Sequence, residues 1–435
     1  MIDVLALPGI EPDDIKVFDE GYVRIIAKVI ECAHPSCPVC GKPLYRHGRR
    51  RIEFADTPMR SLPVRLVINR PRYRCDVCGK TLTIELPFLD ERRRATRRLI
   101  EAIRAQCFSQ TFHHTASMNG LAVNTIKSIT HDLIAELDAT VRYETPVIMG
   151  IDELNLAGGY RCIITNLATN SVFQMLEQRT KAHMQPFFRD LPNRENVQWV
   201  CTDMWRPFKE SFGPYLPNAR LVIDRFHVVR MASDALDDER KKHQSALSRD
   251  GRVHVKKSIR WLTLKRPSSL SAAEKQAMAI VRKSMPALAE AYDVKEAFYS
   301  IYEEPTKERA MRSFDVWKES IPANGFEKFH SLAKTVYNHY EDIFAYWDAP
   351  VRITNAYTEG LNGLIKMANR LGRGYSYEVI RAKTLYAKQA RKVGSNSLSA
   401  ERGAKGVSTN RAPRHVEYGP HIPTLIEMSD KGELS

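Results

Sequence analysis

The pattern of apolar and polar positions divides the N-terminal third of the chain into two regions of different secondary structure. Residues 51–58 and 61–75 predict β-strands, and the second of these segments alternates apolar with basic residues. Residues 91–138 instead show apolar positions at helical spacing, interrupted at Gly120, which predicts a helix, a glycine-containing turn and a second amphipathic helix. The apolar positions of this helical pattern are Leu99, Ile103, Cys107, Ile126, Ile129, Leu133 and Leu137.

From Pro146 the pattern changes to short apolar runs separated by helical segments. The runs at 147–154, 160–167 and 171–178 predict three strands. Those at 197–205 and around 219–227 predict two more, each preceded by a predicted helix. Three strands, helix, strand, helix, strand is the order of an RNase H-like domain, in which the first and fourth strands are neighbours. Residues 231–349 are helical in pattern, with Ser271 and Glu274 forming a predicted capping box.

These patterns predict a multidomain α/β plus α protein. Its parts are an N-terminal zinc-ribbon-like module, a helix-turn-helix bundle, and an RNase H-like mixed sheet interrupted by an all-helical insertion. The tail is rich in small and polar residues, and we expect little packed structure there. The corresponding boundaries are 1–90, 91–142, 143–230 with 350–393, 231–349 for the insertion, and 394–435 for the tail.

The 435-residue length is consistent with two or three domains. No apolar run approaches the roughly 20 residues that span a bilayer, and the acidic N-terminus does not resemble a signal peptide, so we expect an intracellular protein. Between Lys42 and Arg104 there are 17 Lys and Arg against 7 Asp and Glu. The surplus of ten positive charges in this segment is two-thirds of the net charge of +15. Such a concentration of positive charge suits a polyanion, although basic faces are often merely solvated.

Two knuckles, "CPVCG" at 37–41 and "CDVCG" at 75–79, indicate a metal site. Cys37, Cys40, Cys75 and Cys78 supply the four thiolates of a closed tetrahedral Zn²⁺ site, which is structural because no coordination position is left for water. Two redox-active dithiols are the alternative, and Cys32 or His34 could replace one ligand. The 34 residues between the knuckles fit two or more strands, of which the second carries Arg65, Arg70, Arg72 and Arg74.

The helix-turn-helix pattern predicts binding to double-stranded DNA, with a three-helix bundle that binds no DNA as the alternative. The second helix would present Asn124, Thr125, Lys127 and Ser128 to a major groove. The preceding run contains Arg92, Arg93 and Arg94, and phosphate contacts of this kind supply much of the affinity for DNA.

Acidic residues follow or end three of the predicted strands: Asp152, Asp203 and Asp224. In the expected sheet order Asp152 and Asp203 lie side by side, and two such carboxylates call for Mg²⁺ or Mn²⁺. Two ions can hold the attacking and leaving oxygens of a phosphoryl transfer. The third carboxylate is Glu359, which shares a helical face with Asn362, Lys366 and Arg370; a solvated amphipathic stripe is the alternative.

Together, the knuckles, the helix-turn-helix, "GIDE", "CTDMW", "IDRFH" and "TEGLNGLIK" resemble the DDE transposases of the bacterial ISL-three insertion-sequence family, from about Cys37 to Arg381. The resemblance implies that Asp152, Asp203 and Glu359 are the catalytic triad. It also implies that the protein recognises terminal inverted repeats, cuts DNA there and joins the ends to new DNA. A homodimer or larger complex on paired DNA ends and a cytoplasmic, nucleoid-associated location follow from the same resemblance.

Related transposases also carry a Cys/Asp-x-x-His signature, which Asp224 and His227 match. The resemblance therefore makes both accessory residues near the active site, and a purely structural Asp–His pair is the alternative. Two further functions stay open. One is a transposase-derived DNA-binding regulator without strand-transfer activity, and the other is a nuclease that cuts without joining.

Overall fold

The computed structural model describes residues 5–30, 36–83, 85–156, 158–245 and 259–394, with side chains as far as residue 387 in the last segment. They form two compact units. Of the described residues, those in 5–143 and 364–394 belong to the first unit and those in 144–363 belong to the second. The predicted tail and the possible zinc ligands Cys32 and His34 lie outside the described residues.

The first unit contains a sheet in the order β1-β2-β4-β3-β7-β6, with β5 paired to β4. The strands are β1 (Ile10–Phe18), β2 (Tyr22–Val29), β3 (Tyr45–Met59), β4 (Leu62–Arg74), β5 (Thr81–Thr83), β6 (Leu89–Asp90) and β7 (Ala95–Thr96). β3 and β4 form a long antiparallel hairpin whose turn residues, Arg60 and Ser61, both have positive φ. The strands predicted at 51–58 and 61–75 are confirmed.

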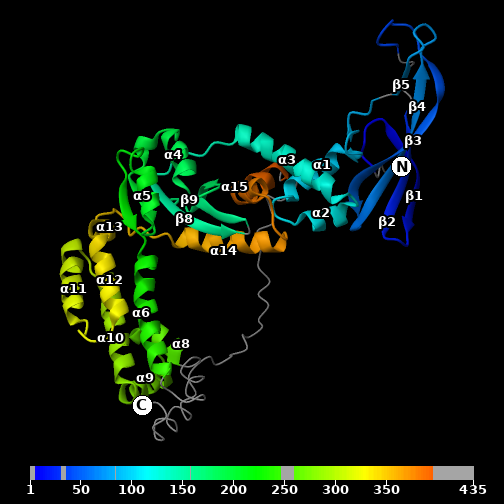
Figure 1. The fold of residues 1–435 in the computed structure, drawn as a ribbon. Coiled ribbons are helices and arrows are strands. Elements are labelled where there is room, and N and C mark those ends of the chain that lie inside the picture. Colours follow the sequence, from blue (N-terminus) through cyan, green and yellow to red (C-terminus); the bar gives the residue numbers. More distant parts are fainter. Residues whose placement is uncertain (1–4, 31–35, 84, 157, 246–258, 395–435) are drawn as a thin grey trace. The chain divides into compact units, whose positions relative to one another are not determined.

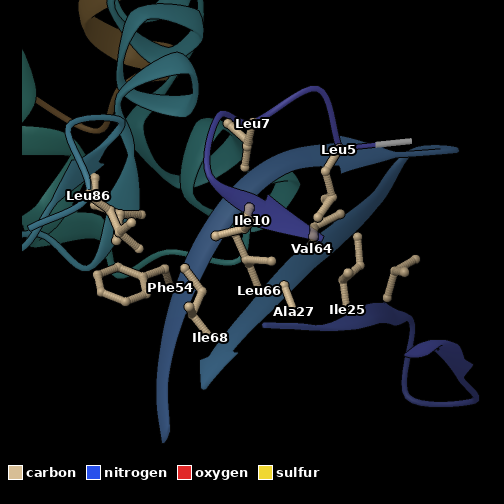
Figure 2. Close-up of a cluster of buried hydrophobic side chains, with 12 residues drawn as sticks. Leu5, Leu7, Ile10, Ile25, Ala27, Phe54, Val64, Leu66, Ile68 and Leu86 are labelled. Atoms are coloured by element: carbon tan, nitrogen blue, oxygen red, sulfur yellow. The ribbon is translucent and has the colours of Figure 1, made fainter. Parts of the chain in front are cut away.

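The core of this sheet comes from the inward-facing residues of four strands. Ile10, Ile25, Leu66 and Phe54 are nearly inaccessible to solvent and lie in one cluster (Figure 2), together with Leu86 from the segment before β6. Because side chains alternate between the faces of a strand, the same strands leave most of their charged residues on the other face; Asp56 and Arg70 are buried exceptions. The alternation visible in the sequence therefore fixes which face of the sheet is buried.

Helices follow the sheet: α1 (Arg97–Gln106), α2 (Phe112–Asn119) and α3 (Val123–Thr140). Gly120 caps α2 in the left-handed conformation, so the predicted break before the second amphipathic helix is confirmed. The prediction that residues 91–138 are helical throughout is wrong in two places. Residues 91–96 form a turn and β7, where Thr96 caps α1, and a further break separates α1 from α2.

A helix from the other end of the chain completes this bundle. α15 (Tyr377–Gly394) packs against α1 and α3. Arg381 Nη1 donates to Asp138 Oδ1 at 2.8 Å, and Lys383 Nζ donates to the carbonyl oxygens of Cys107 and Gln110, both at 2.8 Å. The predicted domain boundaries placed this segment with the sheet that begins at residue 147, whereas the compact unit groups it with the N-terminal helices.

The second unit is built on a mixed sheet in the order β10-β9-β8-β11-β12. The strands are β8 (Ile148–Leu156), β9 (Gly159–Asn166), β10 (Ser171–Leu176), β11 (Trp199–Thr202) and β12 (Arg220–Ile223), and α4 (Lys181–Arg189) and α5 (Arg206–Phe212) lie between them in the chain. β8 and β9 are antiparallel, whereas β11 is parallel to both β8 and β12. All five predicted strands, and the pairing of the first with the fourth, are confirmed.

A helical insertion follows β12 (Figure 1). Its helices are α6 (Arg225–Ser245), α8 (Arg260–Leu264), α9 (Ala272–Ser284), α10 (Pro286–Ile301), α11 (Lys307–Ser320), α12 (Glu327–Asn338) and α13 (Tyr340–Phe344). α10 packs against α6, α9 and α11, and the predicted capping box of Ser271 and Glu274 is present at the start of α9. α14 (Ala356–Leu371) follows and contains Glu359. In the described part of the chain, no helix is long and apolar enough to cross a membrane.

Candidate metal centres and DNA-binding surface

The two cysteine knuckles lie at the open end of the β3–β4 hairpin. Tyr45 pairs with Arg74, so the hairpin brings the segment before β3 beside the segment after β4. Both knuckles have the same backbone geometry. Gly41 N donates to Cys37 O at 2.8 Å, Gly79 N donates to Cys75 O at 2.9 Å, and both glycines have positive φ near 65°.

The four sulfurs of Cys37, Cys40, Cys75 and Cys78 form one cluster. Neighbouring Sγ atoms lie 3.3 to 3.5 Å apart, and none of these cysteines is in a disulfide. The backbone N–H groups of Val39 and Cys40 lower the pKa of the Cys37 thiol to about 6, which favours the thiolate that binds metal. Four thiols converging on one point fit a structural Zn²⁺ ion.

Asp152, Asp203 and Asp224 occupy corresponding positions on three neighbouring parallel strands of the second unit. The paired residues are Cys201 with Gly150 on one side and Thr202 with Ile223 on the other. Continuing this register places Asp203 opposite both Asp152 and Asp224, at strand spacings of about 4.8 Å. Asp203 is thus the middle acid of the row. Asp152 lies within β8 and not at its end, because β8 continues to Leu156 in its pairing with β9.

Asp152 is almost completely buried and is oriented by its neighbours. Its Oδ2 accepts a hydrogen bond from Asn362 Nδ2 at 2.8 Å, and its Oδ1 accepts one from the backbone N–H of Glu153 at 2.8 Å. Asp203 Oδ1 accepts from the backbone N–H of Trp205 at 2.9 Å. Burial, together with the carboxylates of Asp152 and Asp203, raises the pKa of the Cys162 thiol.

Asp224 is inaccessible to solvent and holds the segment that leads into α14. Its Oδ1 accepts from the backbone N–H of Asn355 at 3.0 Å and from Thr354 Oγ1 at 3.2 Å. Asn355 Nδ2 in turn donates to the carbonyl oxygen of Ile151 at 3.1 Å. Asp224 therefore fixes where α14 begins, one turn before Glu359.

Glu359 lies beside Asp224 and His227. One ligand atom from each of these three residues lies within 4.8 Å of the other two, with His227 Nε2 and Glu359 Oε1 3.6 Å apart. Burial and the carboxylates of Asp224 and Asp152 raise the pKa of Glu359 to about 7. Within the described residues, Asp152, Asp203 and Glu359 do not form such a group, although the Asp152 carboxylate is near enough to contribute to the raised pKa of Glu359.

Several buried polar atoms around these acids have no hydrogen-bond partner among the described residues. They are Thr202 Oγ1, Asp224 Oδ2, His227 Nε2 and Asn362 Oδ1. Because leaving a buried polar group unpaired is costly, such atoms are typical of sites that take up an ion or a water molecule. Carboxylate and other oxygen donors suit Mg²⁺ or Mn²⁺, so the donor set fits a divalent ion.

The residues that join α14 to the sheet were not predicted from the sequence. Thr358 Oγ1 and Thr165 Oγ1 are 2.7 Å apart, and both are inaccessible to solvent. A Cβ atom on Gly150 would meet Asn355 Oδ1 and Thr165 Oγ1, each at 2.5 Å, so only glycine leaves room for this packing. The glycine two residues before Asp152 was the available sequence signal, because a glycine within a strand often marks a close approach.

The side chains predicted to bind DNA differ in how far they are exposed to solvent and in whether they are already paired within the protein. On α3, Asn124 and Lys127 are exposed, and Thr125 and Ser128 are half-buried. Arg92 and Arg94 are exposed, although Arg92 Nη2 pairs with Asp132 Oδ2 at 3.0 Å.

Two arginines are instead engaged within the protein. The Arg93 side chain is only 11% exposed and pairs with Asp90 and Asp132, and Arg70 is buried against Glu91. Lys366 and Arg370 are exposed on α14. Arg93 and Arg70 are therefore the weakest of these candidates for contact with phosphate.

Comparisons with known proteins match most of the chain. Residues 149–384 match a family described as transposase, of the ISL3 (ISL-three) type. Residues 84–134 match the helix-turn-helix domain of transposase family ISL3, and residues 33–78 match the zinc-finger of transposase IS204/IS1001/IS1096/IS1165.

Two curated relatives are similar to this chain over most of their length. The chain is 23% identical to the transposase for insertion sequence element IS1001 of Bordetella parapertussis, over 81% of this chain and 87% of that protein. It is 22% identical to the transposase for insertion sequence element IS1557 of Mycobacterium tuberculosis, over 85% of this chain and 91% of that protein.

Proposed function

The chain belongs to the ISL3 family of transposases, and from this premise we propose a specific activity for it. The protein recognises the terminal inverted repeats of an insertion sequence and catalyses Mg²⁺-dependent strand cleavage and strand transfer through Asp152, Asp203 and Glu359. The observation that supports this most is the row of acids on three adjacent parallel strands, with α14 anchored beside them.

An RNase H-like fold for the second unit is part of the proposal. The strand order β10-β9-β8-β11-β12, with the first three strands antiparallel and the last two parallel to β8, supports it. The insertion between β12 and α14 leaves the row of acids intact. We retain the division into a zinc module, a helix-turn-helix domain, a catalytic domain with its insertion, and a tail as the functional organisation.

Asp152, Asp203 and Glu359 would hold the divalent ions, with Mn²⁺ able to replace Mg²⁺. When bound, such ions polarise the scissile phosphate and activate the attacking oxygen. Asn362 keeps the carboxylate of Asp152 in one orientation through its 2.8 Å hydrogen bond. Cleavage breaks a phosphodiester with water as the nucleophile and releases a 3′-hydroxyl. This 3′-hydroxyl then attacks a phosphodiester of the target DNA, forms the new P–O bond and displaces a 3′-hydroxyl of the target strand. No side chain has to act as a nucleophile.

Asp224 and His227 are accessory residues in this proposal. Asp224 accepts two hydrogen bonds from the segment before α14, so its principal role is to position the helix that carries Glu359. His227 faces Glu359 at 3.6 Å and can hold that carboxylate when it is not bound to an ion. Because these residues surround Glu359, Asp224 is the natural replacement for Asp203 if Asp203 proves dispensable.

The test uses the purified full-length protein and duplexes from both flanks of its coding sequence, where the element ends are expected. With Mg²⁺ and a supercoiled target plasmid, we expect nicks at the element ends and then joined products. Asp152→Ala, Asp203→Ala and Glu359→Ala should each abolish both products and leave DNA binding largely intact. Binding without nicks in the unmodified protein would contradict the proposal and favour a regulator, whereas nicks without joining would favour a nuclease.

Two copies of the protein on paired ends are expected, because joining two ends requires both to be held together. Crosslinking in the presence and absence of end DNA tests this part of the proposal separately. A single copy on each joined product would refute it.

A further inference from the structure

A cavity of about 600 Å³ lies within the first unit, between the helix-turn-helix helices and a loop that follows α14. The loop is residues 372–376, which we call the glycine–arginine loop. The α3 side of the cavity is formed by Val123, Lys127 and His131, which are four residues apart and share one helical face. The cavity therefore joins the predicted DNA-reading helix to a segment about 240 residues later in the sequence.

The glycine–arginine loop is held in one conformation. Asn369 is nearly buried, its Oδ1 accepts from the backbone N–H of Tyr375 at 2.9 Å, and its carbonyl oxygen accepts from Gly374 N at 2.9 Å. A Cβ atom on Gly372 would lie 2.1 Å from the Tyr375 ring, so that position requires glycine. Tyr375 packs edge-to-face on Phe112 of α2, with ring centroids 5.3 Å apart. The loop is thus a fixed part of the helical bundle.

Arg373 occupies a costly position at the tip of this loop. Its φ is +59°, in the left-handed region that glycine adopts freely and other residues rarely adopt. Its side chain is exposed at the cavity, and in the described part of the chain neither Arg373 nor Lys127 makes an ion pair. Strain of this kind is often kept where the side chain has a function.

We propose that the glycine–arginine loop is a second part of the DNA-binding site, in which Arg373 and Lys127 hold the DNA backbone beside the groove occupied by α3. Guanidinium and ammonium groups bind phosphate oxygens, and such contacts position a protein without reading sequence. This inference rests on the proposed role of α3 in binding the element ends. It adds to the helix-turn-helix a segment that follows the catalytic helix directly in the chain.

The experiment measures binding of the full-length protein to an end duplex and to an unrelated duplex of equal length, without Mg²⁺, at several salt concentrations. Each phosphate contact contributes about 0.9 to the slope of log K against log salt. Arg373→Gly should weaken binding to both duplexes by a similar factor and reduce the slope by about one. Arg373→Lys keeps the charge and should retain most of the slope.

Arg373→Gly cannot lose binding through misfolding, because glycine accepts the observed φ; its melting temperature should equal or exceed that of the unmodified protein. Arg142→Ala is the matched control, since Arg142 is exposed in the same unit and does not line the cavity. Its salt slope should not change. An unchanged slope in Arg373→Gly would overturn the inference.

The two proposals fail in different ways. If the unmodified protein binds DNA but never cuts it, while Arg373→Gly reduces the slope, the proposed transposition fails and this binding site stands. If cutting occurs and the slopes are equal, only the binding site fails. Inorganic phosphate is tested as a separate probe. Protection of Arg373 from chemical modification by phosphate alone, but not by DNA, would also overturn the inference.

Discussion

Replacing Gly150 with alanine tests whether α14 must lie directly against β8. The new Cβ would be 2.5 Å from both Asn355 Oδ1 and Thr165 Oγ1 and 2.9 Å from Leu167 Cδ2, whereas ordinary contacts begin at 3.4 Å. β8 is paired on both sides and cannot move easily. The side chains of Asn355 and Thr165 must therefore both give way by roughly 1 Å, which pushes the start of α14 outward, and overpacking of this kind costs about 1–3 kcal/mol.

The consequence for function follows from the hydrogen bonds of Asn355. Its backbone N–H donates to Asp224 and its side chain donates to Ile151 O, and both bonds fix the start of α14. Displacing the helix by roughly 1 Å moves Glu359, and a misplacement of this size in a catalytic centre can cost about 100-fold in rate. For a unit of this size, we also expect the melting temperature to fall by about 2–12 °C.

The assay combines thermal unfolding with cleavage of end duplexes. Gly363→Ala is the control, because nothing lies within 4 Å of a Cβ at that position of α14 and alanine favours a helix by about 0.5–1 kcal/mol. The control should melt at the same temperature or higher. If Gly150→Ala melts and cleaves like the unmodified protein, the close packing of α14 on β8 is not what positions Glu359.

Three further predictions concern single groups. Glu359 titrates near pH 7 in place of its ordinary value of 4.5, so the folded, metal-free protein holds a proton that the unfolded chain releases, and stability falls as pH rises from about 4.5 to 7. Glu359→Gln should remove that loss. It should raise the free energy of unfolding at pH 8 by about 1 kcal/mol, after allowance for solvent screening, and leave it unchanged at pH 4. If thermal unfolding gives the same pH profile for this variant and for the unmodified protein, the prediction is refuted. Asp224→Ala leaves the Asn355 N–H unpaired and should cost about 1–3 kcal/mol in a denaturant titration, whereas Asp224→Asn keeps an acceptor and should cost less; equal losses would argue against the anchoring role. Cys75→Ser should remove Zn²⁺ from the purified protein and lower its affinity for DNA, and a full complement of zinc in that variant by elemental analysis would contradict the four-cysteine site.

The sequence predicted the elements well because their signals are local. Alternating residues in 61–75 and the short apolar runs before Asp203 and Asp224 each indicate a strand by themselves, and the structure contains those strands. The knuckles were equally readable, because Gly41 and Gly79 mark their turns. Breaks in the helical region were predicted only where a glycine marked them. The break between α1 and α2 has no such residue.

Contacts between distant segments were not predictable in the same way. Lys383 donates to two carbonyl oxygens in the segment between α1 and α2, and Asn362 donates to Asp152 across 210 positions of sequence. Neither residue differs in type or local pattern from many solvated polar residues on helices. Glu359, Asp224 and His227 were each identified by a motif, but the direct contact of Glu359 with the other two follows from the fold, because it depends on where β12 and α14 lie.

The most direct test of the account is the binding of Mn²⁺ to the zinc-loaded protein, measured by electron paramagnetic resonance for the unmodified chain and for Asp152→Ala, Asp203→Ala and Glu359→Ala. We predict that the unmodified protein binds Mn²⁺ and that each substitution weakens binding at least tenfold, with cleavage of end DNA lost in parallel. Mn²⁺ binding and cleavage that survive in Asp203→Ala and disappear in Asp224→Asn would contradict the account and assign the ion to Asp224.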